Sequence, residues 1–118
     1  MLNDKAHENL QAGEILLARG HVNAAASRLY YAMYQAAVHR LTRLGIRPGN
    51  VRSGAVEWDH SMVENNAKQL RGRWSDRLLY RQCRARRVEA DYTDIPVREI
   101  DVRECRGEIA DLVGDLTR

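Results

Sequence analysis

Arginines are the residues with the clearest capacity for chemistry, and seven of them lie within residues 71–87. This stretch has one acidic residue and no lysine, so its formal charge is +6. It also contains two aromatic residues, Trp74 and Tyr80. The spacing of Arg77, Arg81 and Arg84 places them on one face of a helix. Because the arginine fork suits phosphate and aromatic rings can stack on bases, we predict a basic patch that binds RNA or another phosphorylated ligand. The alternatives are a solvated face, or salt bridges to the acidic helix expected over residues 97–116.

The chain has four histidines, and none has the HxxH or HExxH spacing of a metal-binding helix. We therefore predict no metal site, and no phosphate-binding glycine loop or other pattern indicates a cofactor. His60 follows a loop rich in glycine, residues 45–58, at the expected start of a helix. It is a weak candidate for proton transfer, and the alternative is a helix-start residue near solvent.

Tyrosines cluster in the stretch "SRLYYAMYQAAVHR", residues 27–40. In a helix Tyr30 and Tyr34 share a face, which favours packing in the core or an interface, with each hydroxyl needing a hydrogen-bond partner. Arg28 and Tyr31 are better placed to face a polar groove.

A second polar stretch, "RRVEADY", spans residues 86–92. In a helix Arg87 and Asp91 have the i, i+4 spacing of an ion pair, so the stretch has a structural explanation as well as a chemical one.

The elements that must position these residues are predicted to be helices. Apolar periodicity and glycine breaks indicate helices over residues 4–18, 22–44, 59–71, 75–90 and 97–116. The second has a wide apolar face, which is typical of a central helix with several neighbours. The fold class is therefore all-α, an antiparallel bundle of four to five helices, and residues 1–118 form one domain.

Composition narrows the class of protein further. The chain is 44% hydrophobic and 30% charged with a net charge of +3, which is typical of a globular protein. Cys83 and Cys105 have no metal-binding spacing and are interpreted as buried thiols in a reducing compartment. The polar first residues do not resemble a signal peptide, and no apolar run reaches the length of a membrane span. We therefore expect a cytoplasmic protein that does not contact a membrane.

Residues 7–45, "HENLQAGEILLARGHVNAAASRLYYAMYQAAVHRLTRLG", together with the later "RRVEADY", resemble the HEPN family (higher eukaryotes and prokaryotes nucleotide-binding). The similarity is to the small stand-alone group and extends over residues 5–116. It implies a helical bundle that forms a homodimer. Many family members are metal-independent RNases, often toxins of toxin–antitoxin systems that are paired with a minimal nucleotidyltransferase.

The resemblance also implies a groove, which would hold Arg28, Tyr31, Arg87, Asp91 and Tyr92. The family's RNases use an arginine followed by four to six residues and then a histidine. This chain departs from that motif, because its nearest pair, Arg52 and His60, has seven intervening residues and lies in another segment.

We therefore expect a non-catalytic HEPN-like module that binds RNA, a nucleotide or a nucleotidyltransferase partner. One alternative is an RNase toxin with a displaced site, for which Arg87, Tyr92 and His60 are the weak catalytic candidates. The other is a structural dimer without a ligand.

Overall fold

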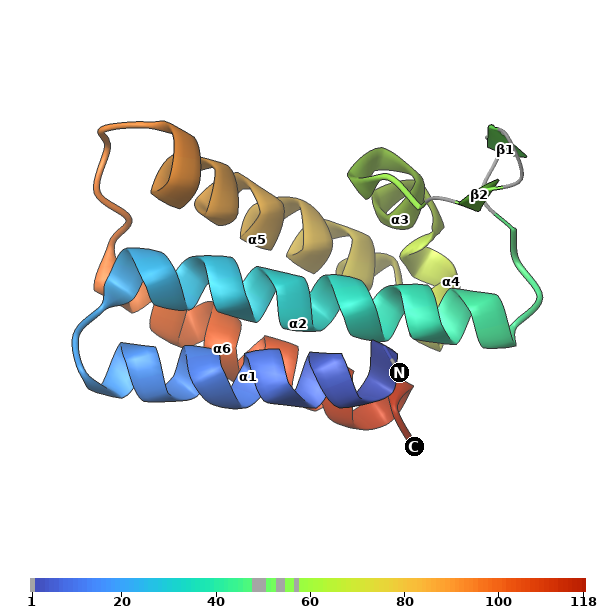
Figure 1. Cartoon of the computed structure of the whole chain (residues 1–118), viewed down its shortest axis with the longest axis horizontal. Helices are drawn as coiled ribbons and strands as arrows, with labels where there is room; N and C mark the ends of the chain where they lie inside the picture. The colour runs from blue at the N-terminus through green and yellow to red at the C-terminus, as the bar shows by residue number, and fades with distance from the viewer. Residues whose placement is uncertain (1, 48–50, 53–54, 57) are drawn as a thin grey trace.

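Helices dominate the structure, a computed structural model (Figure 1). It describes residues 2–47, 51–52, 55–56 and 58–118 of the chain. The long helices are α1 (Leu2–Ala18), α2 (Val22–Arg43), α5 (Trp74–Tyr92) and α6 (Glu99–Leu116). The short elements between α2 and α5 are strands β1 (Val51–Arg52) and β2 (Ala55–Val56) and helices α3 (His60–Asn66) and α4 (Lys68–Arg71). The predicted all-α class is confirmed.

Each long helix runs opposite to the long helix before it (Figure 1). The central element is α2, which packs against α1, α5 and α6, as its wide apolar face predicted. Its buried residues are Ala25, Ala26, Leu29, Tyr30, Ala32, Met33, Ala36, Ala37, Val38 and Leu41. Half of them are alanines, whose small side chains let neighbouring helices approach closely. The tightest approach is at Gly13 of α1, where an added Cβ would lie 2.8 Å from the Leu29 side chain. This close approach explains the glycine within an otherwise regular helix.

The helix predicted over residues 59–71 is divided in two, so that prediction was wrong in part. The first piece, α3, ends at Asn66, whose side-chain amide donates to the carbonyl of Met62 at 2.8 Å. A side chain that bonds this carbonyl competes with the backbone hydrogen bonds of the helix. The second piece, α4, ends at Gly72, which has the left-handed φ of 69° that glycine adopts without strain.

The predicted loop over residues 45–58 contains a short antiparallel pairing of β1 with β2. Val51 is opposite Val56, and Arg52 is opposite Ala55. Residues 48–50, 53–54 and 57 lie outside the described part of the chain. The loop leads into α3, which places His60 beside α2.

Candidate functional site

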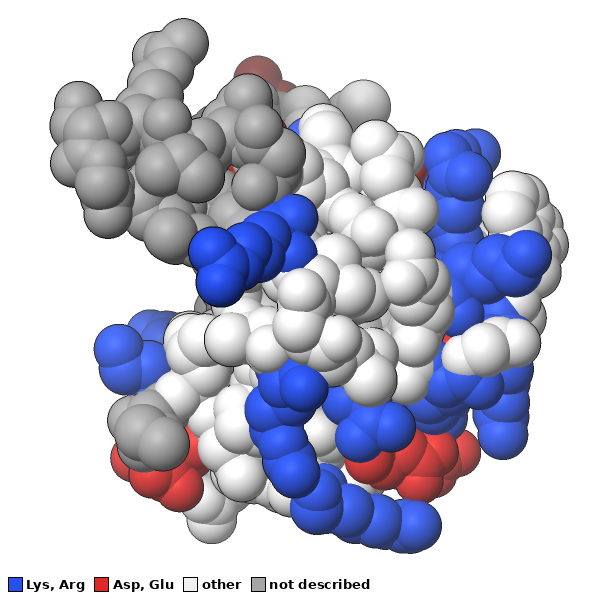
Figure 2. Space-filling model, turned by 90° about the vertical axis from the view of Figure 1, so that its right-hand side faces the viewer, with Lys and Arg blue, Asp and Glu red and all other residues white. Residues whose placement is uncertain are grey.

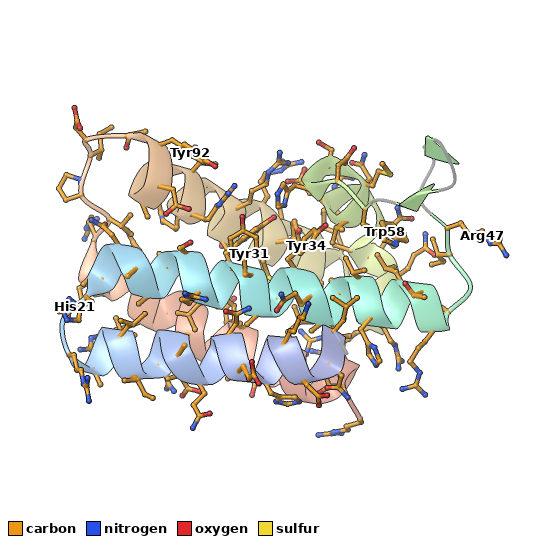
Figure 3. All side chains as sticks on the ribbon, in the orientation of Figure 1. His21, Tyr31, Tyr34, Arg47, Trp58 and Tyr92 are labelled. Carbon is orange, nitrogen blue, oxygen red and sulfur yellow. The ribbon has the colours of Figure 1, made fainter. Side chains whose placement is uncertain are left out.

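Three tyrosines of α2 surround the imidazole of His60. The ring centroids of Tyr30, Tyr31 and Tyr34 lie 5.5, 6.4 and 4.9 Å from that of His60. In Figure 3, Tyr31 and Tyr34 follow one another along the side of α2 that faces α3 and α5. The tyrosines therefore belong to one site, although only Tyr30 among them is fully buried.

Two hydrogen bonds fix the start of α3 and with it His60. The carboxylate of Asp59 caps the helix by accepting a hydrogen bond from a first-turn backbone amide at 2.8 Å. The hydroxyl of Tyr34 donates to the backbone carbonyl of Trp58, immediately before the cap. The imidazole is therefore positioned both by the cap of its own helix, α3, and by the bond from α2 to the segment before that helix.

A chain of hydrogen bonds runs from the core to His60. The hydroxyls of Tyr80 and Tyr30 are 2.8 Å apart, and the hydroxyl of Tyr30 is 2.5 Å from Nδ1 of His60. Both phenols are fully buried, and burial raises the pKa of Tyr30 to about 12 and also raises that of Tyr80. Both hydroxyls therefore stay protonated at neutral pH.

The direction of this chain follows from hydrogen-bond accounting. If His60 donated to Tyr30, then Tyr30 would donate to Tyr80, and the Tyr80 proton would have no acceptor among the described residues. A buried donor without a partner is costly, so Tyr80 donates to Tyr30 and Tyr30 donates to Nδ1. The imidazole is therefore neutral with its proton on Nε2.

The charges around His60 favour the same neutral form. Burial lowers the pKa of His60 from its ordinary value of 6.5, and the positive charges of Arg87 and Arg84 lower it further, against a smaller opposite effect of Asp59. A neutral imidazole next to two guanidinium groups can exchange protons with a ligand whose phosphate the arginines hold.

Arg87 joins the predicted groove residues Tyr31, Asp91 and Tyr92 into one group, called here the Arg87 cluster. Its Nη2 donates to the hydroxyls of Tyr31 at 2.8 Å and Tyr92 at 3.1 Å. Its Nε lies 3.2 Å from Oδ2 of Asp91, but the N–H does not point at that oxygen, so this contact is ionic rather than a directed hydrogen bond. The guanidinium also lies over the ring of Tyr31, at 5.2 Å from its centroid.

Arg28 does not lie in this cluster, so its predicted place beside Tyr31 in the groove is wrong. Its Nη1 donates at 3.2 Å to the side chain of Asn9 in α1, which in turn donates to Gln35 at 2.8 Å. Arg28 and Gln35 line a separate groove between α1 and α2. The periodicity of the sequence predicted the face of α2 on which Arg28 lies. It could not show that α1 packs against that face.

The arginines of the predicted basic patch have different surroundings. The exposed Arg81 is within 3.6 Å of Glu64, and the guanidinium of Arg77 lies over the ring of Trp74, 5.3 Å from its centroid. Arg84 is half-buried and has no carboxylate at ion-pair distance within the described ranges.

Two other arginines of the stretch make the salt bridges that were the alternative explanation. Arg71 contacts Asp115 of α6 at 2.7 Å, and Arg86 contacts Asp101 at 3.6 Å. The alternative therefore describes these two arginines but not Arg84. Figure 2, a view onto the end of the bundle that carries α4, shows Lys and Arg side chains spread over that end with fewer acidic ones between them.

Tyr80 is the site residue whose role the sequence did not indicate. It was interpreted as a stacking ring among arginines, whereas it is fully buried and bonded to Tyr30. Its i, i+3 spacing from Cys83, which was interpreted as a buried thiol, was the available signal for an inward orientation.

The fold and the site together define a class of protein, an all-helical bundle in which an imidazole lies between tyrosine and arginine side chains. Comparison of the chain with models of protein families, with curated proteins and with solved structures yields no match. Within the part of the chain that the structure describes, none of the helices combines the length and apolar composition that a membrane crossing requires. The same residues contain no group of three or more His, Cys, Asp or Glu side chains arranged to hold a metal ion.

Proposed function

We propose that the chain is a HEPN-like module that binds the phosphate groups of RNA or of a nucleotide beside Arg84. The observation that carries this proposal is the position of Arg84, which has no carboxylate partner among the described residues yet lies near enough to His60 to lower its pKa. A half-buried guanidinium without a counter-charge is a favourable place for an anion. The resemblance of the sequence to nucleotide-binding helical proteins supports the same ligand class.

Single-stranded RNA is the form of ligand that the surroundings of Arg84 favour. The ring of Trp74 is 56% exposed, and Arg77 and Lys68 lie over it at 5.3 and 5.8 Å from the centroid. Exposed aromatic rings next to cationic side chains stack on bases without sequence preference. Trp74 and Arg84 both lie on α5, so a strand that follows this helix can contact both.

The test is a binding titration with a fluorescent single-stranded RNA at several salt concentrations. Replacing Arg77, Arg81 and Arg84 together by alanine should weaken binding. It should also reduce the slope of log affinity against log salt by about 0.7 for each phosphate that the variant no longer binds. Arg84→Met alone should account for a large share of the loss in affinity.

A matched control removes the same amount of charge elsewhere. Arg19, Arg98 and Arg103 are exposed and lie outside α5, so their joint replacement by alanine should leave most of the affinity intact. Equal losses in the two triple variants, or no measurable RNA binding by the wild-type chain, would contradict the proposal.

RNA cleavage without a metal is the second candidate function, and the position of His60 is the observation that favours it. Its neutral imidazole lies close to two arginines, one of which is Arg87, although the arginine–histidine spacing of the family's RNases is absent. The catalytic candidates are then His60 and Arg87, with Tyr92 bonded to the latter. Incubation of total RNA with wild type and His60→Gln tests this function, because cleavage that persists in the variant excludes His60.

We further propose that the chain forms a homodimer through the outer face of α5. Three exposed residues with large apolar side chains have the spacing i, i+10 and i+14 on this helix, namely Leu78, Val88 and Tyr92. The exposed Arg81 and Ala85 lie between Leu78 and Val88 on the same face, so the apolar residues form two groups along the helix. Exposed apolar side chains that share one face of a helix are typical of an interaction site. A second copy is the occupant that the resemblance implies, and a minimal nucleotidyltransferase is the alternative.

The pair of substitutions Leu78→Glu and Val88→Glu should convert the dimer to a monomer in light scattering, because it places charges in the apolar interface. Ile15→Glu, at an exposed apolar position on α1, is the control and should leave the dimer intact. A monomeric wild type, or a dimer that survives both charges on α5, would refute this interface. The structural dimer without a ligand would show the same dimer but no affinity for RNA.

A further inference from the structure

Two thiols meet between α5 and α6, away from the tyrosines and arginines around His60. Cys83 of α5 is buried and Cys105 of α6 is half-buried, and neither is in a disulfide. Both line one small cavity, whose other walls are Ala26, Leu29, Arg86, Val102 and Ile109. Each thiol also lies close enough to the other to shift its pKa. The two thiols therefore lie close together where α5 packs on α6.

The two thiols differ in access to solvent. Cys83 is buried and lines the apolar cavity, whereas the half-buried Cys105 also borders a second, polar pocket at the surface. This polar pocket is lined by Gln82, Arg86, Asp101, Glu104, Cys105 and Glu108. A small oxidant can therefore reach Cys105 from solvent, whereas Cys83 is buried.

The reactivity of the two thiols differs in the same sense. The hydrogen bond from Cys83 and, to a lesser extent, the charge of Arg86 lower the pKa of Cys105, while burial, Glu108 and Asp101 act in the opposite direction. For Cys83, the hydrogen bond to Cys105 and burial raise the pKa. The accessible thiol is also the one that ionises first, and the thiolate is the nucleophile.

We propose that Cys83 and Cys105 form a reversible redox pair in which a hydroperoxide oxidises the two thiols to a disulfide that joins α5 to α6. Nothing in this proposal depends on RNA binding. It assigns Cys105 as the residue that attacks the peroxide and Cys83 as the residue that resolves the product.

The reaction has two balanced steps. The thiolate of Cys105 attacks one peroxide oxygen, the O–O bond breaks, and the departing oxygen takes a proton and leaves as alcohol or water, so that Cys105 becomes a sulfenic acid. The sulfur of Cys83 then attacks the sulfur of Cys105, the S–O bond breaks, and hydroxide leaves with the thiol proton of Cys83 as water. The pair loses two electrons to the peroxide, and a dithiol restores it.

The disulfide is expected to stabilise the chain. It would close a loop that includes the end of α5, residues 93–98 and the start of α6. A crosslink of this kind reduces the conformational freedom of the unfolded state. It would also fix the part of α5 next to Arg84, the residue that follows Cys83.

The experiment uses the full chain, hydrogen peroxide as the oxidant and intact-mass measurement as the readout. The wild type should lose the mass of two hydrogen atoms while remaining one chain under non-reducing conditions, and its melting temperature should rise until dithiothreitol reverses both changes. Cys83→Ser should instead accumulate a sulfenic acid on Cys105, which a dimedone reagent labels. Cys105→Ser should react with hydrogen peroxide much more slowly than the wild type or Cys83→Ser.

Several outcomes would overturn the proposal. These are a wild type that acquires oxygen but forms no disulfide, a disulfide that links two chains, and a Cys105→Ser variant that is oxidised as fast as the wild type. Peptide mapping of the oxidised wild type keeps the test valid if a serine variant fails to fold, because the Cys83–Cys105 bridge is then either found or absent.

Discussion

Replacing Arg71 by alanine is expected to lower the free energy of unfolding by about 3 kcal/mol. The guanidinium of Arg71 in α4 holds both carboxylate oxygens of Asp76 in α5, with Nε 3.0 Å from Oδ2 and Nη2 2.7 Å from Oδ1. Its Nη1 lies 2.7 Å from Oδ2 of Asp115 in α6. Because Asp76 is only 2% exposed, alanine at position 71 leaves a buried carboxylate without its counter-charge. Urea unfolding followed by circular dichroism measures the effect.

Three variants separate this explanation from a general loss of packing. Arg71→Lys keeps the charge but not the planar fork, so its cost should lie between those of wild type and alanine. Adding Asp76→Asn to Arg71→Ala should recover part of the loss, because the buried charge is removed. The surface pair of Arg103 with Glu99, at 3.1 Å, is the control, and Arg103→Ala should cost less than about 1 kcal/mol. A loss for Arg71→Ala no larger than this control would contradict the prediction.

The pH dependence of stability gives a second measurement of the same site. The hydrogen bond from Arg71 holds the pKa of Asp115 below its ordinary value of 3.8, and Arg118 adds to this effect. A carboxylate with a lowered pKa in the folded state contributes stability that is present above pH 3.8 and is lost as the pH falls toward its folded pKa. The Arg71→Ala variant should therefore lose part of this acid dependence, and an unchanged acid dependence would contradict the assignment.

The long helices could be predicted because local signals determine them. Apolar spacing indicated α1, α2, α5 and α6, and glycines at positive φ, Gly20 and Gly45, end the first two. The positions at which the helices begin and end were predicted less accurately than the helices themselves. The helix predicted from residue 75 begins at Trp74, after Arg73, which makes no side-chain capping bond.

Of the interactions in the candidate site, only those within a single helix could be predicted from the sequence. The i, i+4 pair of Arg87 with Asp91 was visible in the sequence, because both residues lie on α5. The hydrogen bonds of Tyr30 with Tyr80 and His60 join residues that are 50 and 30 positions apart. Interactions of this kind depend on how α3 and α5 pack on α2, which no periodicity within one helix determines.

Replacing Tyr30 by phenylalanine is expected to cost about 1–3 kcal/mol of folding free energy, the penalty for leaving a buried polar group without a partner. The Tyr30 hydroxyl is the middle of the chain, so its removal leaves the buried Tyr80 hydroxyl without an acceptor and Nδ1 of His60 without a donor. Tyr80→Phe should cost less, because Tyr30 then still donates to His60. Thermal and urea unfolding measure both losses.

The double variant tests the direction of the hydrogen bonds. When Tyr30 and Tyr80 are both phenylalanine, no buried hydroxyl of this chain of bonds remains unpaired, so the combined cost should be smaller than the sum of the single costs. Nitrogen shifts of His60 give the second readout, since Nδ1 should be unprotonated and Nε2 protonated in the wild type and this fixed tautomer should be lost in Tyr30→Phe. Tyr31→Phe, which removes only the bond from Arg87, should leave the tautomer unchanged. Equal and additive costs for the two single variants, or a proton on Nδ1 in the wild type, would contradict the assigned direction and the tautomer with its proton on Nε2.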